Sequence, residues 1–414
     1  MKKQTLLSMA LVASIACGAR NLKSDVDLSH DLWWNAPEVA MINLTLTDTL
    51  GATVSSTIEF YVTPDIDASS RIMSVKMPVI NNEATANLSF EMPMLAPGFY
   101  KCHLLDDGIE IKTFNIGYEP TNIVSLPDSP ADFDEFWQRA IAELAAVPGE
   151  YVVAENQQAS GKLRKAYDVS MRSLGGETIR GRLYVPVKKG KYPALIYYNG
   201  YGGKIWDMDV DGRSDIIEFV TGVRGQMFNE PYNTYGDWIR YNLGEPESYY
   251  YRGAYMDTLR FLDFIEQHPS VDTSRIYAEG GSQGGALTLV AAALAPSRFK
   301  GIAPYIPFMS DFPDYFKIVE WPKSAIMKAA REKGLSEQQA LDCMRYFDVK
   351  NFARKISCPV MMGIGLQDPT CPPHTNMSSY NLITSPKELI IYPTCGHTVD
   401  YSDWNPRRDK FISD

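Results

Sequence analysis

The stretch RIYAEGGSQGGALTLVAAAL, residues Arg275 to Leu294, decides how the chain folds. Its first residues are typical of a short strand and its last residues of a helix rich in alanine and leucine, with the turn GGSQG at 280–284 between them. The turn has the pattern Gly-x-Ser-x-Gly, which can hold a serine on a strained elbow between strand and helix. Gly280 and Gly284 suit such an elbow because a Cβ at either position would collide where the two backbones approach. Ser282 is therefore a candidate nucleophile.

An acid and a base follow two later strands. The continuous apolar run Pro359–Gly365 predicts a buried parallel strand, and Asp368 lies just beyond its end. The run Glu388–Tyr392 predicts the next strand, and His397 follows it. Open α/β sheets gather functional groups at the carboxyl ends of their strands. The chain order serine, acid, histidine is the order found in the α/β-hydrolase fold.

These three side chains predict nucleophilic catalysis. A serine hydroxyl is a weak nucleophile at neutral pH, so His397 would take the proton of Ser282 while Asp368 fixes and stabilises the imidazolium. His374 also follows the serine, but it comes too soon after the acid to lie beyond the next strand. This chemistry needs no metal and no organic cofactor, and we expect neither.

A second turn predicts the oxyanion hole. Tyr192–Tyr198 reads as a buried strand that ends in NGYGG at 199–203. In α/β-hydrolases a turn at this place supplies one backbone N–H to the oxyanion, and the residue after the nucleophile supplies the other. The backbone amides of Tyr201 and Gln283 are therefore the candidate donors, although the turn taken alone is also compatible with an ordinary β-turn.

Length and composition indicate two domains. The chain has 414 residues and a formal net charge of −10, which argues against a nucleic-acid-binding surface. From residue 20 to residue 118, short segments of alternating polarity are separated by turn residues, which predicts a small all-β sandwich of immunoglobulin size. Trp33 and Trp34 at its start could stack on a sugar or, as is more usual, supply buried area. Four segments read most clearly as strands: Ala40–Thr45, Ser56–Val62, Ala84–Phe90 and Gly98–Leu105.

The remaining residues, 119–414, predict an α/β domain. Between its strands lie a long irregular loop at Met227–Tyr251 and a largely helical segment at Asp311–Lys355. Long loops of this kind are usually functional. We therefore expect an α/β-hydrolase domain with a helical cap, placed after the all-β sandwich.

The first 19 residues read as a signal peptide. Lys2 and Lys3 precede an apolar run from Leu6 to Ala16, the arrangement of a secretory signal. Two processing routes fit, namely cleavage after Ala16 or Ala19 and lipidation of Cys17. Either route predicts an exported protein, periplasmic or at the cell surface and without a transmembrane span.

Five cysteines lie beyond the signal segment. Five is an odd number, so at least one thiol stays unpaired, and their spacing gives no metal-ligand pair. Export makes disulfides chemically accessible, which leaves the pairing of Cys371 with Cys395 open. The five are Cys102, Cys343, Cys358, Cys371 and Cys395.

Several motifs together cover the chain from about Pro120 to its end. They are DFDEFW at 132–137, RGQ at 224–226, YYRG at 250–253, GGSQGG at 280–285, RYFD at 345–348, GLQD at 365–368, CPP at 371–373 and YP at 392–393. In these motifs the chain resembles the acetyl xylan esterase and cephalosporin-C deacetylase family of carbohydrate esterases. The resemblance implies removal of O-acetyl groups from xylo-oligosaccharides and other small acetylated molecules through an acyl-enzyme. It also implies a triad of Ser282, Asp368 and His397, oxyanion donors at Tyr201 and Gln283, and a ring-shaped homo-oligomer.

Two positions depart from the family pattern. Thr398 stands where the family usually has glutamate after the histidine, and Asn199 stands where it commonly has histidine at the oxyanion turn. Neither change removes a catalytic group. Both changes make acetylated-xylan specificity and the ring-shaped homo-oligomer less certain expectations. The N-terminal sandwich could also block assembly of that oligomer. Two other functions stay open from the sequence, a serine peptidase on the same fold and a non-catalytic glycan-binding surface protein.

Overall fold

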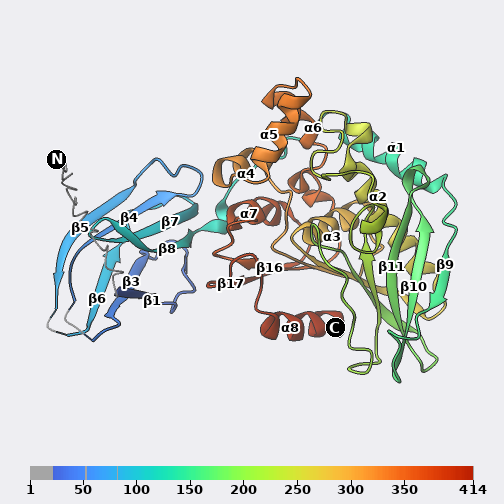
Figure 1. The fold of residues 1–414 in the computed structure, drawn as a ribbon, viewed down its shortest axis with the longest axis horizontal. Coiled ribbons are helices and arrows are strands. Elements are labelled where there is room, and N and C mark those ends of the chain that lie inside the picture. Colours follow the sequence, from blue (N-terminus) through green and yellow to red (C-terminus); the bar gives the residue numbers. More distant parts are fainter. Residues whose placement is uncertain (1–21, 52–53, 82, 414) are drawn as a thin grey trace, which may run out of the picture.

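A computed structural model describes residues 22–51, 54–81 and 83–413 of the chain. The expected signal peptide, with Cys17, lies outside the described residues. An all-β part, residues 22–118, lies beside a larger α/β part that holds the rest of the chain (Figure 1). We call the first part the N-terminal β-region. No helix among the described residues is long and apolar enough to cross a membrane.

The N-terminal β-region consists of two sheets that face each other. One has three strands in the order β1-β3-β6, and the other has five in the order β2-β8-β7-β4-β5. Phe60 of β4 stacks on Phe90 of β6 with ring centroids 4.1 Å apart, which joins the two inner faces. Trp34 is 3% exposed, so it supplies buried area. The strands are β1 Leu22–Val26, β2 Trp33–Trp34, β3 Met41–Asp48, β4 Ser55–Pro64, β5 Met73–Ile80, β6 Thr85–Glu91, β7 Gly98–Asp106 and β8 Ile109–Tyr118.

The α/β part is built on one nine-stranded sheet. Its order is β17-β16-β15-β14-β12-β13-β11-β10-β9, and every neighbouring pair from β13 to β17 is parallel. The antiparallel hairpin of β10 and β11 extends the sheet at its other end. The strands are β9 Val152–Glu155, β10 Arg164–Arg172, β11 Thr178–Pro186, β12 Tyr192–Tyr197, β13 Ile217–Gly222, β14 Val271–Gly281, β15 Gly301–Tyr305, β16 Val360–Gly365 and β17 Lys387–Tyr392.

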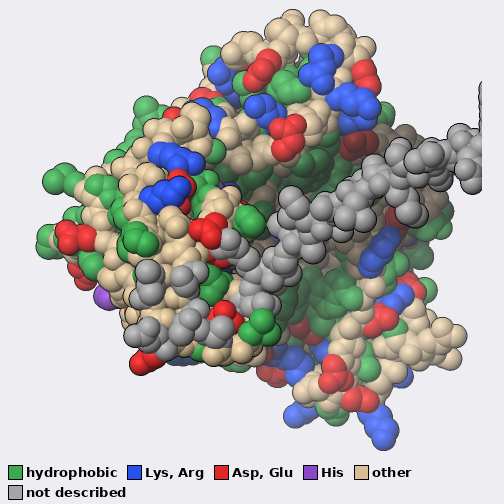
Figure 2. Space-filling view, turned by 60° about the vertical axis from the view of Figure 1, so that its left-hand side comes forward, with side chains coloured by type: hydrophobic (Ala, Val, Ile, Leu, Met, Phe, Trp, Pro, Cys, Tyr) green, Lys and Arg blue, Asp and Glu red, His purple; other side chains and the backbone are tan. Residues whose placement is uncertain are grey.

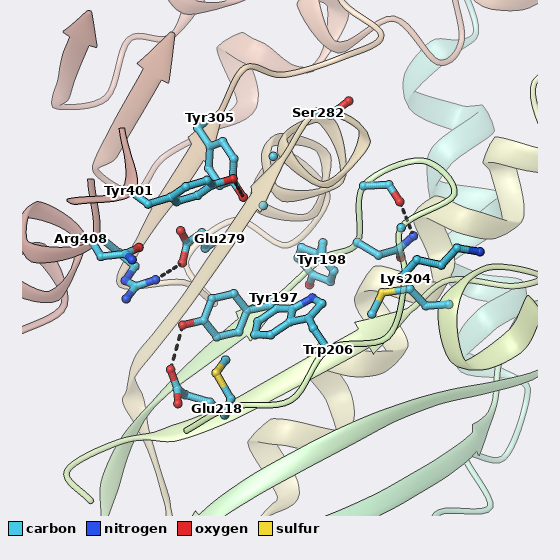
Figure 3. Close-up of a pocket in the computed structure, with 18 of the residues that line it drawn as sticks. Tyr197, Tyr198, Lys204, Trp206, Glu218, Glu279, Ser282, Tyr305, Tyr401 and Arg408 are labelled. Carbon is cyan, nitrogen blue, oxygen red and sulfur yellow. Dashed lines mark hydrogen bonds and ion pairs between the residues drawn. The ribbon is translucent and has the colours of Figure 1, made fainter. Parts of the chain in front are cut away.

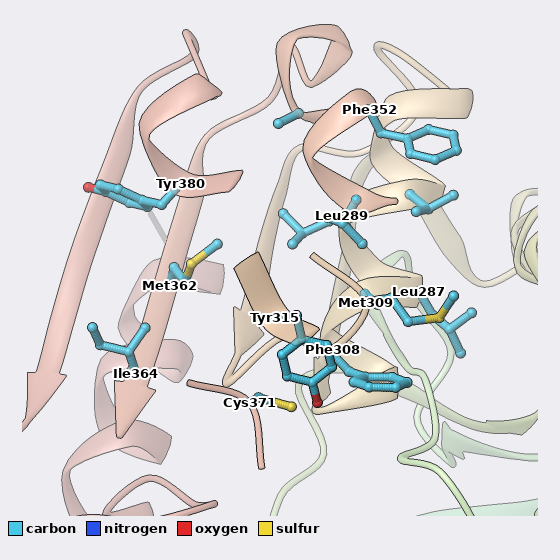
Figure 4. Close-up of a cluster of buried hydrophobic side chains, with 14 of the residues drawn as sticks. Leu287, Leu289, Phe308, Met309, Tyr315, Phe352, Met362, Ile364, Cys371 and Tyr380 are labelled. Carbon is cyan, nitrogen blue, oxygen red and sulfur yellow. The ribbon is translucent and has the colours of Figure 1, made fainter. Parts of the chain in front are cut away.

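Helices cover both faces of this sheet. Helices α2, α3 and α7 lie on one face and α8 on the other, while α4, α5 and α6 form the expected cap (Figure 1). Leu287 and Leu289 of α3 belong to the same buried apolar cluster as Met362 and Ile364 of β16 (Figure 4). The helices are α1 Phe133–Ala145, α2 Tyr250–Gln267, α3 Gln283–Leu294, α4 Phe312–Ile318, α5 Lys323–Glu332, α6 Glu337–Met344, α7 Pro373–Leu382 and α8 Tyr401–Ser413.

One crossover departs from the usual pattern. Parallel neighbours are normally joined through a helix that covers the sheet, but residues 198–216, which join β12 to β13, form turns and extended chain without a helix. Residues of this loop and of α8 line one hollow at the sheet, which is described below. Charged side chains of both signs are interspersed over the molecular face in Figure 2.

Candidate active site

Ser282 lies at a strained elbow between β14 and α3. Its backbone has φ 57° and ψ −121°, a region that a residue with a side chain rarely adopts. A Cβ at Gly280 would lie 2.5 Å from the backbone of Gly284, and a Cβ at Gly284 would lie 2.2 Å from the carbonyl oxygen of Tyr198. The two flanking glycines are thus required by close backbone packing.

Three predicted residues lie in one hydrogen-bonded row. His397 Nε2 is 3.0 Å from Ser282 Oγ, and its Nδ1 is 2.8 Å from Asp368 Oδ2. The carboxylate of Asp368 is buried and also accepts hydrogen bonds from the backbone N–H groups of Thr370 and Cys371 at 2.7 and 2.8 Å. The acid is therefore held in one orientation, and the imidazole is placed to exchange a proton with the serine oxygen.

Cys371 brings a thiol to the same place. Burial raises the pKa of this thiol well above its usual value, the charge of Asp368 adds to the rise, and the hydroxyls of Ser282 and Tyr315 offset part of it. The sulfur of Cys371 lies next to the hydroxyl of Tyr315 in Figure 4. Among the described residues, Asp368, Cys371 and His397 form the one group whose ligand atoms gather closely enough for a metal ion. A protonated thiol is a poor metal ligand, so these groups fit proton transfer better than metal binding.

The two predicted oxyanion amides belong to adjoining segments. Gln283 is the first residue of α3, where a backbone N–H has no partner within its helix and points along the positive end of the helix dipole. Tyr201 lies in a tight turn closed by a 3.0 Å hydrogen bond from Gly203 N to Gly200 O. The Gln283 side chain donates to the carbonyl of Asn199 at 3.3 Å, so the turn rests on the start of the helix.

A buried amide network holds that turn, and sequence reasoning missed its role. Gln226 and Gln283 exchange side-chain hydrogen bonds of 3.1 and 3.0 Å. The side-chain oxygen of Gln226 also accepts from Gly202 N and from Asn199 Nδ2, both at 3.1 Å. The hydroxyl of Tyr251 donates to Gln283 Oε1 at 3.0 Å. The only sequence signal was the motif RGQ at 224–226, because contacts between segments this far apart depend on the tertiary fold.

Aromatic side chains flank the turn on its outer side. The ring of Tyr201 meets Trp238 and Trp321 edge-on, at centroid distances of 5.0 and 5.6 Å. Its hydroxyl donates to Asp237 at 3.0 Å. Trp238 and Asp237 come from the long loop after β13, and Trp321 comes from the cap. The loop and the cap, both expected near the site, therefore meet at Tyr201.

A hollow of about 780 Å³ opens beside Ser282 beneath the helix-free crossover (Figure 3). Tyr197, Trp206, Tyr305 and Tyr401 bring aromatic rings to it. The hollow is also lined by Glu279 of β14, an acid that is unusual in a buried parallel strand.

Two side chains of the last helix explain how Glu279 can be buried in a parallel strand. Trp404 Nε1 donates to one carboxylate oxygen at 2.7 Å, and an Arg408 nitrogen donates to the other at 2.8 Å. Burial raises the pKa of Glu279, and Arg408 and Trp404 offset part of that rise. The buried acid is thus neutralised by α8, which closes this side of the hollow.

The N-terminal β-region holds the loop that carries the acid. The Gln367 side chain accepts from Asn115 N at 2.7 Å and donates to Asn115 O at 3.1 Å, while Asn115 Nδ2 donates to Leu366 O at 3.0 Å. These residues directly precede Asp368. The acid therefore follows a segment that is pinned from outside the α/β part.

His374 forms a second link between the two parts. Its Nδ1 is 3.1 Å from Asp65 of the N-terminal β-region, and its Nε2 is 3.5 Å from Asp314 of α4. Burial alone would lower the pKa of His374, but Asp65 and Asp314 outweigh it and raise the pKa to about 10. The imidazole is therefore a buried cation between two carboxylates, away from Ser282.

All five described cysteines are free, Cys371 and Cys395 among them.

Known proteins resemble the part of the chain that holds this site. The family model described as acetyl xylan esterase (AXE1) matches residues 121–413. Acetyl esterase Axe7A of Xylanibacter ruminicola is 28% identical over 338 residues, which cover 78% of this chain and 75% of that protein. Acetyl xylan esterase 1 of Thermoanaerobacterium sp. JW/SL YS485 superposes with a TM-score of 0.65 at 26% identity, over 71% of this chain and 96% of that one. Acetyl xylan esterase of Paenibacillus sp. R4 superposes with a TM-score of 0.66 at 30% identity, over 71% and 97%. The family resemblance seen in the sequence is thereby confirmed, and the chain belongs to the acetyl xylan esterase family.

Proposed function

We propose that the protein is an exported serine esterase that removes O-acetyl groups from short acetylated carbohydrates such as xylo-oligosaccharides. Family membership makes the chain a carboxylic ester hydrolase. The observation that carries the residue assignment is the row Ser282, His397 and Asp368 at a strand-to-helix elbow. In the proposal these are the nucleophile, the base and the acid that orients the base.

The proposed reaction has two halves. His397 Nε2 accepts the proton of Ser282 as Oγ attacks the acetyl carbonyl carbon, and the amides of Tyr201 and Gln283 stabilise the oxyanion. The imidazolium then gives its proton to the departing sugar oxygen, leaving an acetyl-serine. In the second half His397 deprotonates a water that attacks the same carbonyl, which releases acetate and restores the serine.

The proposed domain organisation follows the expected boundaries. Residues 1–19 would be removed or processed as a signal, residues 20–118 would form the sandwich domain and residues 119–414 the esterase domain. Intact-mass analysis of the mature protein from fractionated cells tests the first assignment. A mature chain that begins at residue 20, or at residue 17 without added mass, indicates cleavage. A lipid mass on an N-terminal Cys17 indicates anchoring, and a retained residue 1 contradicts both.

Acetate release tests the catalytic assignment. The wild-type protein should release acetate from p-nitrophenyl acetate and from acetylated xylo-oligosaccharide, and Ser282→Ala should lower both rates by about 10³-fold or more. Ser379→Ala, which also removes a buried hydroxyl but in α7, is the matched control and should keep the wild-type rates. Wild-type turnover by Ser282→Ala would remove Ser282 as the nucleophile.

The two other functions raised by the sequence are not favoured by the family match. A peptidase would cleave a peptide amide faster than the acetyl ester. A non-catalytic glycan-binding protein would fail to react with an organophosphonate at Ser282. Both measurements use the same full-length preparation.

A further inference from the structure

A second hollow lies where the N-terminal β-region meets the α/β part. It encloses about 540 Å³, within the roughly 300–1,000 Å³ common for small-molecule sites. We call it the interdomain groove. One wall comes from β7 and β8 of the N-terminal β-region, and the other from the cap and from the acid-bearing loop after β16. The residues used below are Lys101, Thr113 and Asn115 on the first wall and Glu320, Trp321 and Thr370 on the second.

The two walls of the groove are fixed to each other. Asn115, on one wall, is hydrogen-bonded through its backbone and side chain to Gln367 and Leu366 on the other. Asp65, also a lining residue, is paired with the buried imidazole of His374. The width of the groove is therefore set by buried polar contacts, which suits a preformed binding site.

Trp321 connects the groove to the candidate active site. It lines the groove and is 39% exposed. Its ring stacks on Phe308 with a centroid distance of 5.5 Å and an interplanar angle of 15°, and it meets Tyr201 edge-on. Phe308 in turn donates its backbone N–H to the carbonyl of Ser282 at 3.0 Å. One exposed indole thus stands between the elbow and the groove, and the segment that carries Asp368 lines the groove as well.

The chemistry of the lining points to a neutral polyhydroxylated ligand. Lys101 donates, Glu320 accepts, and Thr113, Asn115 and Thr370 can do both. The lining holds one base and three acids, but Asp65 is paired with His374 and Asp368 with His397. One base and one acid, Lys101 and Glu320, are left to face a ligand, a lining that favours neither a polyanion nor a polycation. An exposed indole presents an apolar face on which the C–H face of a sugar ring can stack, with hydroxyl partners on both sides.

We propose that the interdomain groove binds the sugar chain whose acetyl group is cleaved at Ser282, with Trp321 as the stacking platform. The N-terminal β-region supplies the far wall of this site, although it precedes the family match at 121–413. This inference rests on the proposed function for the identity of the sugar. It gives the N-terminal β-region a part in substrate selection.

Calorimetry with xylohexaose, which carries no acetyl group, tests the groove separately from catalysis. The parent is full-length Ser282→Ala, so binding is measured whether or not this serine is the nucleophile. Adding Trp321→Leu or Lys101→Ala should weaken xylohexaose binding by about fivefold each, the effect expected for one stacking contact or one hydrogen bond. Lys76→Ala on β5, an exposed lysine of the same region outside the groove, is the matched control and should bind like the parent.

Two results would overturn the inference. One is unchanged affinity in both groove variants, and the other is no xylohexaose binding by the parent at millimolar concentration. In the chain that retains Ser282, Lys101→Ala should lower kcat/KM for acetylated xylo-oligosaccharide about fivefold relative to p-nitrophenyl acetate, mainly through KM. An equal loss on both esters would indicate a structural effect and would also contradict the proposal. If the wild-type protein does not hydrolyse p-nitrophenyl acetate at all, the result would instead count against the proposed function alone.

Discussion

Gln367 and Asn115, 252 residues apart in the chain, exchange two hydrogen bonds between a side-chain amide and a backbone. Gln367 also donates to the carbonyl of Pro393 at 2.8 Å, on the segment that leads to His397. One amide therefore ties together the N-terminal β-region, the segment before Asp368 and the segment before His397. The geometry of the acid and the base depends on this contact.

Removing the Gln367 side chain should slow the enzyme. We expect Gln367→Ala to lower kcat/KM by about 10- to 100-fold on p-nitrophenyl acetate, because small misplacements of catalytic groups have effects of this size. Asn115→Ala is the matched control, since it keeps the backbone groups and loses only the bond to Leu366 O. Steady-state kinetics and a melting curve are measured on each variant. A Gln367→Ala protein that melts earlier but keeps kcat would show that the contact only supports stability.

The amide network around Gln226 should matter for the oxyanion. Gln226→Ala leaves Gly202 N and Asn199 Nδ2 without their acceptor, so the turn that carries Tyr201 loosens. We expect kcat to fall by roughly 10-fold or more with little change in KM, given that a whole oxyanion donor contributes about 10²- to 10³-fold. Asn229→Ala, another buried amide on the same loop, should lower stability without this loss of kcat. Equal kcat in both variants would contradict the role of Gln226.

His374 should make stability depend on alkaline pH. The pKa of this imidazole is raised from 6.5 to about 10 in the folded chain, so its contribution is full below pH 6.5 and is lost as the pH rises towards 10. At about 1.4 kcal/mol per pKa unit, a shift of this size corresponds to a contribution on the order of 5 kcal/mol. Urea unfolding between pH 6 and 10 should show a steeper decline for wild type than for His374→Gln. Parallel profiles for the two proteins would contradict the assignment.

Arg408 should contribute to the stability of the fold only while the Glu279 carboxylate is charged. Arg408→Met leaves a buried carboxylate without its cation, which we expect to lower the free energy of unfolding by about 3 kcal/mol at neutral pH. In a Glu279→Gln background the same change should have a smaller effect, so the double-mutant cycle isolates the pair. The pKa of Glu279 is raised, so Arg408→Met should regain stability as the pH falls. Additive losses across the cycle would mean that the two side chains act independently.

Local sequence predicted the elbow because its constraint is local. Gly280 and Gly284 are required by backbone contacts within one turn, and that requirement is visible in five residues. The strand ends that carry Asp368 and His397 were predictable for a similar reason, since buried parallel strands are continuous apolar runs. The four expected strand segments of the N-terminal β-region are confirmed as β3, β4, β6 and β7.

Other features could not be predicted from local sequence because they depend on tertiary contacts. Pro78 interrupts the pattern of β5, and the strand forms nonetheless because it is the edge strand of its sheet, where a missing N–H is tolerated. Glu279 is tolerated in a buried strand because Arg408, from the last helix, pairs with its carboxylate. The partnership of Gln226 with Gln283 joins residues 57 positions apart, which no local pattern encodes.

The N-terminal β-region contacts the segment after β16 at two places, through Asn115 and through Asp65. These contacts bear on whether the α/β part can be produced alone. A chain starting at residue 119 would expose the amide of Gln367 and the carbonyl of Leu366 and would leave His374 with only one of its two carboxylates. A truncated α/β part should therefore need compensating substitutions at Gln367 and His374 before it works as a stand-alone enzyme.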